Sequence, residues 1–215
     1  MTPTAAMQPG YSTLASERSV DRWPHCMLVT GPRGAGTTRW VDECVGRLME
    51  RHPGNRCGVL LADQSPVRKD TACADKPGVV VRGCFLPCTC CPSAADLPAA
   101  VHGLVQANQP SWIFIEIPVI AAPGLIAEFD RMVRWPRSLV VCLTPAWARA
   151  RRMGTLSPFQ LLLLETADVT IANDEEATAA MARVLPTGDI AREFPVSRPR
   201  DAGLPGRIRP VCHRS

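Results

Sequence analysis

A glycine-rich segment between an apolar run and an amphipathic run restricts the fold of this chain more than any other feature. The run Cys26–Thr30 (CMLVT) has the length and composition of a buried strand. The segment Gly31–Thr38 (GPRGAGTT) follows at once, and from Thr38 to Met49 the apolar residues recur at helical spacing. A strand, a tight glycine turn and a helix in this order direct backbone N–H groups and a helix N-terminus at one point, which favours a bound phosphate.

The same alternation of apolar strands and amphipathic helices continues along the chain. Five further strands are expected: one that begins at Val79–Val81 and runs into a cysteine cluster, and four at Gly58–Ala62, Trp112–Ile117, Ser138–Leu143 and Val169–Ala172. The helices expected after the first one lie at Leu97–Val105, Leu125–Val133, Phe159–Glu165 and Glu175–Val184. Continuous apolar strands separated by helices predict an α/β fold with a mostly parallel β-sheet and helices on both faces. Such sheets bind ligands beyond the carboxyl ends of their strands.

The glycine-rich segment follows the phosphate-loop template G-x-x-x-x-G-K-[ST] with one replacement. Thr38 holds the hydroxyl position that ligates Mg²⁺, whereas Thr37 stands where the lysine belongs. The residues predicted to bind a nucleotide here are Gly31, Arg33, Gly34, Ala35, Gly36, Thr37 and Thr38. Without the lysine we expect weaker affinity and much slower phosphoryl transfer, unless Arg33 or Arg39 provides the charge. The alternative is a tight strand-to-helix turn that binds nothing.

A cluster of cysteines after the third expected strand points to metal chemistry. Cys88, Cys90 and Cys91 form a C-x-C-C group, and Cys84 precedes it by four residues. Thiolates this close repel one another unless a soft cation such as Zn²⁺ binds them, and a tetrahedral site then needs a fourth ligand or keeps an open position. The alternatives are a cysteine-rich loop without a ligand and a reversible disulfide in a thiol redox protein. Four other cysteines fall in apolar segments and are expected in the core: Cys26, Cys44, Cys57 and Cys142.

Charge and composition exclude some classes of function. The net charge is +4, and the segment Val196–Ser215, with five arginines and one acid, accounts for it. The rest of the chain is neutral, so a specific nucleic-acid-binding domain is not indicated. No run of about 18 apolar residues and no secretory h-region occurs, which predicts no membrane span and a cytoplasmic protein. We expect a flexible segment at 1–22, a nucleotide-binding domain at 23–195 and a basic Pro/Arg-rich tail at 196–215.

Taken in order, these motifs resemble the CobW-type family, relatives of the nickel-insertion GTPases of urease and hydrogenase. Members carry a phosphate loop and then a G-C-x-C-C motif followed by an acidic-Leu pair, which Cys88–Cys91 and Asp96-Leu97 resemble. Their E-[ST]-[ST]-G-x-A-[DE]-P segment is similar to Glu116–Pro123, which keeps the glutamate but not the hydroxyls or the glycine. Their N-K-x-D base-recognition motif is similar to Asn173–Glu176, in which Asp174 replaces the lysine.

The resemblance implies a P-loop NTPase-like fold, with GTP, Mg²⁺ and a transported metal (Zn²⁺, or Co²⁺ or Ni²⁺) as ligands. It implies Glu116 as a catalytic residue, Asn173 and Glu176 as contacts of the base, and a client metalloprotein as partner. Nucleotide occupancy of the phosphate loop is expected to be coupled to the cysteine loop, because both follow strands at the same edge of the sheet. The replaced residues imply weak or absent hydrolysis. The alternative function is that of an inactive pseudo-GTPase, acting as a regulatory or interaction module.

Overall fold

The computed structural model describes residues 24–63, 71–86, 96–133, 135–172 and 174–185. They form one six-stranded sheet in the order β3-β2-β4-β1-β5-β6. The strands are β1 (His25–Thr30), β2 (Cys57–Asp63), β3 (Val79–Phe85), β4 (Trp112–Glu116), β5 (Arg137–Cys142) and β6 (Val169–Ile171). Every pairing is parallel, so all the carboxyl ends of the strands lie at one edge of the sheet. The sheet that the sequence predicts as mostly parallel is therefore fully parallel in this part of the chain.

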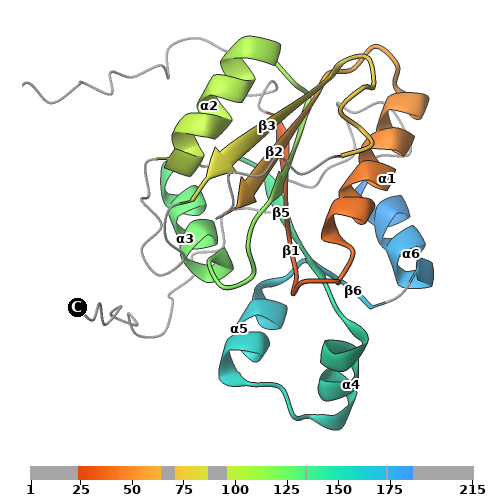
Figure 1. The fold of residues 1–215 in the computed structure, drawn as a ribbon, viewed down its shortest axis with the longest axis vertical. Coiled ribbons are helices and arrows are strands. Elements are labelled where there is room, and N and C mark those ends of the chain that lie inside the picture. Colours follow the sequence, from red (N-terminus) through yellow and green to blue (C-terminus); the bar gives the residue numbers. More distant parts are fainter. Residues whose placement is uncertain (1–23, 64–70, 87–95, 134, 173, 186–215) are drawn as a thin grey trace, which may run out of the picture.

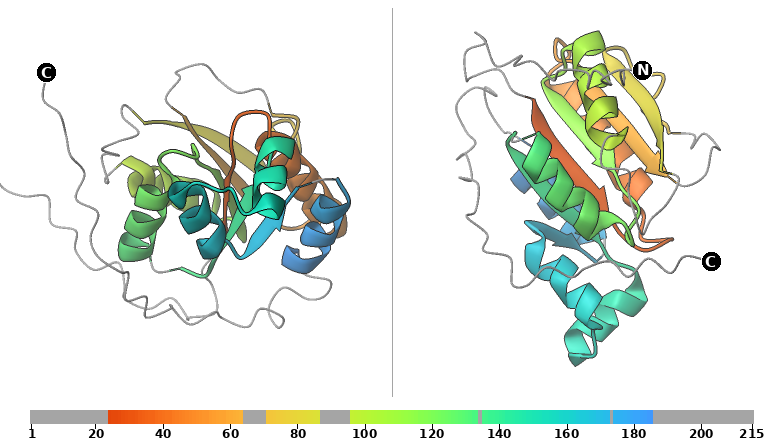
Figure 2. Two further views of the ribbon diagram at one scale, coloured as in Figure 1. Left: turned by 90° about the horizontal axis from the view of Figure 1, so that it is seen from below. Right: turned by 90° about the vertical axis from the view of Figure 1, so that its left-hand side faces the viewer.

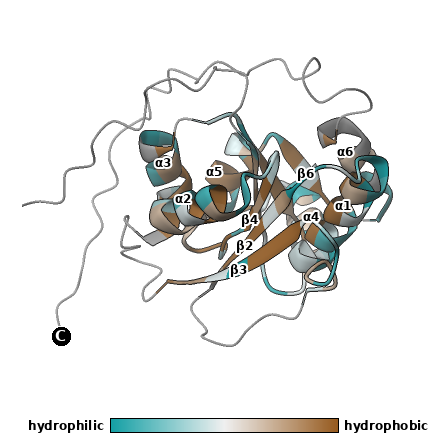
Figure 3. Ribbon diagram, turned by 90° about the horizontal axis from the view of Figure 1, so that it is seen from above, coloured by the Kyte–Doolittle hydropathy of each residue, from teal (hydrophilic) through white to brown (hydrophobic). Residues whose placement is uncertain are grey.

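Helices cover both faces of this sheet, as expected from the apolar strands (Figures 1 and 2). The helices are α1 (Thr37–Arg51), α2 (Asp96–Asn108), α3 (Ala122–Met132), α4 (Pro145–Met153), α5 (Pro158–Thr166) and α6 (Asp174–Val184). Two hydrophobic cores result: α2, α3 and α5 pack on one face, and α1 and α6 pack on the other. Figure 3 shows the apolar strands between these two layers of helices. The described helices include none with the length and apolar character that crossing a bilayer requires.

The strands begin and end within a few residues of the predicted bounds, but α4 is missing from the prediction. Its start has a clear local signal, because the Thr144 hydroxyl accepts a hydrogen bond from the backbone N–H of Trp147 at 3.4 Å and Pro145 takes the first helical position. Its end is marked by Gly154, which has a φ of 67°. The helix is only nine residues long and rich in arginine, so no apolar periodicity reveals it.

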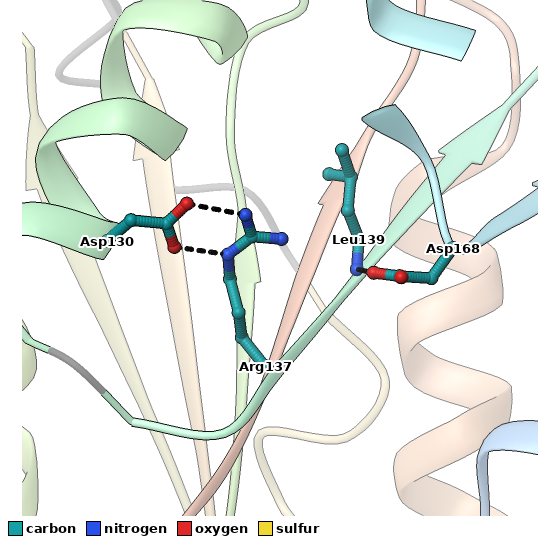
Figure 4. A network of polar contacts seen from close by, with 4 residues as sticks. All are labelled: Asp130, Arg137, Leu139 and Asp168. Atoms are coloured by element: carbon teal, nitrogen blue, oxygen red, sulfur yellow. Dashed lines mark hydrogen bonds and ion pairs between the residues drawn. The ribbon is translucent and has the colours of Figure 1, made fainter. Parts of the chain in front are cut away.

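Polar contacts hold the strand beginnings together at the edge of the sheet opposite to the phosphate loop. The carboxylate of Asp168 accepts a hydrogen bond from the backbone N–H of Leu139 at 2.7 Å, which ties the start of β6 to β5 (Figure 4). The guanidinium of Arg137 donates to both carboxylate oxygens of Asp130, and this pair connects β5 to α3. These contacts position strands, and they lie away from the edge where ligands bind to parallel sheets.

The predicted interior position of four cysteines is confirmed: Cys26, Cys44, Cys57 and Cys142 are each at most 1% exposed. Burial raises the pKa of the first three far above the ordinary value of a thiol. The same desolvation, together with the Glu116 carboxylate, raises the pKa of Cys142 to about 12. These thiols stay protonated at neutral pH and act as small core residues. The predicted terminal segments 1–22 and 196–215 lie outside the described residues.

Candidate nucleotide-binding site

The loop between β1 and α1 has a geometry that strongly favours glycine at three positions. A Cβ atom on Gly31 would lie 2.4 Å from the carbonyl oxygen of Cys142, at the end of the neighbouring strand β5. Gly34 and Gly36 have φ angles of 81° and 78°, in the left-handed region, and Gly36 is the residue that precedes the first turn of α1. The loop therefore lies tightly against the sheet edge and leads directly into the start of a helix.

The two threonines at the start of α1 donate hydrogen bonds to one buried carboxylate. The hydroxyl of Thr37 lies 2.8 Å from Oε1 of Glu116, and the hydroxyl of Thr38 lies 3.0 Å from Oε1 and 2.9 Å from Oε2. Glu116 is 5% exposed and is the last residue of β4. Because β4 pairs with β1 and places Glu116 beside Val29, this carboxylate reaches the loop from 78 residues away in sequence.

This arrangement suits a hard divalent cation. Carboxylate and hydroxyl oxygens are the ligands that Mg²⁺ prefers in proteins. Thr38, predicted from the template as the Mg²⁺ ligand, and Glu116, predicted as catalytic, are in direct contact. Thr37, at the sequence position where the template has lysine, brings a third side chain to the same carboxylate. The residues present therefore fit a bound Mg²⁺.

A pocket of about 250 Å³ adjoins the second half of the loop. It lies between the loop and the start of α1 on one side and the ends of β5 and β6 on the other. Its lining residues are Gly34, Ala35, Gly36, Arg39, Trp40, Glu43, Cys142, Leu143, Pro145, Ile171, Ala172 and Asp174. The sequence patterns identify the glycines but not the apolar wall, because that wall comes from strand ends which only the sheet order brings beside the loop. A flat apolar group with polar edges, such as a nucleobase, suits such a lining.

The two residues expected to contact the base, Asn173 and Glu176, and the intervening Asp174 have different environments. Asn173 lies outside the described residues. Glu176 lies in the first turn of α6, and its carboxylate accepts a hydrogen bond from the backbone N–H of Ala172 at 2.7 Å. Asp174, which replaces the template lysine, lines the pocket and lies 4.0 Å from the guanidinium of Arg39.

The two arginines near the loop take different positions. Arg39 donates a hydrogen bond to Glu43 at 2.9 Å, one turn along α1, and its side chain is 71% exposed. Its contacts with Glu43 and Asp174 place its guanidinium on the pocket side of α1. Arg33 is exposed in the loop itself.

The C-x-C-C group of Cys88, Cys90 and Cys91 lies outside the described residues, so its geometry is not part of the site described above. The strand that leads to it is β3, the edge strand of the sheet. Two strands separate β3 from β1, which corresponds to about 14 Å between their axes at the usual spacing of strands. Within the described ranges, no three His, Cys, Asp or Glu side chains come together in a way that could hold a metal ion.

The parallel sheet with a glycine loop after β1, two threonines at the helix start and a carboxylate from the adjacent strand defines a P-loop NTPase-like fold. Residues 25–177 match the sequence profile of the family described as CobW/HypB/UreG, nucleotide-binding domain. The chain belongs to this family, and the resemblance seen in its motifs is confirmed.

Two solved structures illustrate similarity in shape. Both are the signal recognition particle receptor FtsY from Elizabethkingia anophelis, one of them in complex with GDP. They are 13% identical to this chain, with TM-scores of 0.46 and 0.47, and the alignments cover 85% and 80% of it. The chain spans little more than half of these structures, 57% and 56% of their lengths. No curated protein is significantly similar to it.

Proposed function

We propose that this chain binds GTP with Mg²⁺ at the Gly31–Thr38 loop and carries a divalent metal on Cys88, Cys90 and Cys91 to a client metalloprotein in the cytoplasm. Zinc is the first candidate for the transported metal, and cobalt and nickel are the others. The nucleotide part is supported by the contact of Glu116 with both threonines at the start of α1. The metal part is supported by membership of the family and by the chemistry of closely spaced thiolates.

The proposed preference for guanine rests on Glu176, which stands at the aspartate position of the family's base-recognition motif. A carboxylate can accept two hydrogen bonds from N1–H and the amino group of guanine, whereas adenine presents one donor on the equivalent edge. Asn173 and Glu176 are the proposed contacts by position in the family motif. Glu176 already accepts a bond from the backbone of Ala172, so binding the base would exchange that bond for two others.

Hydrolysis is proposed to be weak or absent. Phosphoryl transfer depends on positive charge placed against the phosphates, and the lysine that provides it in the template is Thr37 here. Thr38 and Glu116 would hold Mg²⁺, which would supply positive charge that offsets part of the charge of the phosphates. Glu116 is the proposed catalytic group because its carboxylate is held by the two threonine hydroxyls at the end of the phosphate loop.

Isothermal titration of the purified chain with GTP and with Zn²⁺ tests this function. The wild type should bind both ligands, and the triple variant Cys88/Cys90/Cys91→Ser should lose zinc binding while it keeps GTP binding. Thr38→Ala is the matched control, because it should weaken binding of Mg²⁺-GTP and leave zinc binding unchanged. Equal zinc binding by the wild type and the triple variant would remove the metal part of the proposal. Absence of GTP binding by the folded protein would remove the nucleotide part.

A second candidate function is that of a pseudo-GTPase, an interaction or regulatory module that keeps the fold without turnover. The observation in its favour is the neutral hydroxyl of Thr37 at the lysine position. Release of inorganic phosphate from GTP and transfer of bound zinc together distinguish the two candidates. Turnover that Thr38→Ala abolishes would exclude the pseudo-GTPase. Without turnover, zinc binding that depends on Cys88, Cys90 and Cys91 would favour the metal carrier, and its absence would favour the pseudo-GTPase.

A further inference from the structure

The position that holds a lysine in the template carries a hydroxyl group in this chain. The Thr37 hydroxyl lies 2.8 Å from Oε1 of Glu116, and the Thr38 hydroxyl lies within 3.0 Å of both carboxylate oxygens. Two hydroxyl oxygens and two carboxylate oxygens are thus gathered from two elements, α1 and β4. In the template, the lysine at this position reaches the phosphates instead.

The negative charge of Glu116 favours binding of a cation and opposes binding of a phosphate without one. Glu116 is buried, and a polyphosphate that enters the loop brings further negative charge close to it. The backbone N–H groups and the start of α1 attract phosphates, but they carry only partial charges. A divalent cation held by the four oxygens would offset both the carboxylate and the phosphates, as the lysine does in the template.

The arginines of the segment do not occupy the place of the lysine. Arg39 is held on the pocket side of α1 by Glu43 and lies 4.0 Å from Asp174. Arg33 precedes the left-handed residue Gly34 and is exposed. Because the Thr37 hydroxyl is neutral, the negative charge of Glu116 and of the phosphates would have to be neutralised by a cation from solution.

We propose that Thr37 adds a further oxygen ligand to the Mg²⁺ site expected at Thr38 and Glu116, and that the loop, lacking the lysine, accepts a nucleotide only as its cation complex. This inference rests on the proposed nucleotide binding and adds the form in which the nucleotide binds. It also assigns Thr37 a role as a ligand, rather than that of a passive replacement. The ligand class is a hard divalent cation, Mg²⁺ or Mn²⁺, together with a nucleoside di- or triphosphate.

Fluorescence anisotropy with a fluorescent GTP analogue, measured with Mg²⁺ and then with excess EDTA, tests the proposal directly on the wild type. Removal of the cation should weaken binding by about a hundredfold, the size expected from the loss of charge-assisted contacts. Thr37→Lys should bind the analogue in EDTA with nearly its Mg²⁺ affinity. Thr37→Ser, which keeps the hydroxyl, is the matched control and should remain dependent on the cation.

Loss of the free Mn²⁺ signal in electron paramagnetic resonance measures the cation without any turnover. The wild type and Thr37→Ser should sequester Mn²⁺, and Glu116→Gln and Thr37→Val should sequester it at least about tenfold less well. Equal nucleotide binding in Mg²⁺ and in EDTA would overturn the inference and leave the proposed GTP binding intact. Absence of nucleotide binding under both conditions, in a protein with a cooperative unfolding transition, would overturn the proposed function and the inference together.

Discussion

The partly buried histidine at the start of β1, His25, makes the free energy of unfolding depend on pH. The ring of His25 lies 4.6 Å from the ring of Trp112, and its Nε2 lies 3.4 Å from the hydroxyl of Ser138. Burial lowers the pKa of His25 from 6.5 to about 4, although the nearby Asp168 carboxylate acts in the opposite direction. The folded protein therefore holds this imidazole neutral at pH values where the unfolded chain protonates it.

The sign and size of the effect follow from this difference in pKa. Because the unfolded chain binds the extra proton, the free energy of unfolding falls as the pH falls from 6.5 to about 4. Between pH 7 and pH 5 the linkage relation gives a loss of about 2 kcal/mol from this one group. Below the folded pKa the loss levels off at about 3 kcal/mol.

Urea unfolding followed by tryptophan fluorescence at pH 7 and pH 5 measures the effect. His25→Gln cannot protonate, so its loss of stability over this interval should be smaller than that of the wild type by about 2 kcal/mol. His102→Gln, at an exposed position of α2, is the matched control and should behave like the wild type. Parallel pH dependence of the wild type and His25→Gln would refute the reasoning.

Three further perturbations test the packing around the site. Gly31→Ala places a Cβ 2.4 Å from the backbone carbonyl oxygen of Cys142. Titration should show that nucleotide binding is lost, and urea unfolding should show a loss of stability of about 2 kcal/mol. Gly58→Ala places a Cβ 2.1 Å from Cδ2 of Leu104, and the cost of about 1–3 kcal/mol should be partly relieved in a double-mutant cycle with Leu104→Ala. Asp42→Ala removes the carboxylate that accepts hydrogen bonds from the backbone N–H groups of Ala72 and Cys73, at 3.1 and 3.2 Å, in the turn before β3. Amide hydrogen exchange in that turn should become faster, while exchange in β1 stays unchanged.

Much of the local structure follows from sequence patterns. The apolar run Cys26–Thr30 and its glycine-rich continuation predict a strand, a tight loop and a helix, and the structure contains them. The ordered motifs also predict the family, which the match over residues 25–177 confirms. The helix α4 could not be found by periodicity, since its signal consists of Thr144-Pro145 at one end and Gly154 at the other. The assignments of Cys88, Cys90, Cys91 and Asn173 remain predictions.

The sequence by itself determined the elements and the loop, because strand length, helical spacing and glycine positions are local properties of the chain. Only the tertiary structure decided what faces the loop. The sheet order places β4 beside β1 although α1, β2, β3 and α2 intervene in sequence, and this brings Glu116 to Thr37 and Thr38. The ends of β5 and β6 form the pocket wall for the same reason. Pairing between distant strands depends on how the whole apolar surface is buried, and no single segment encodes it.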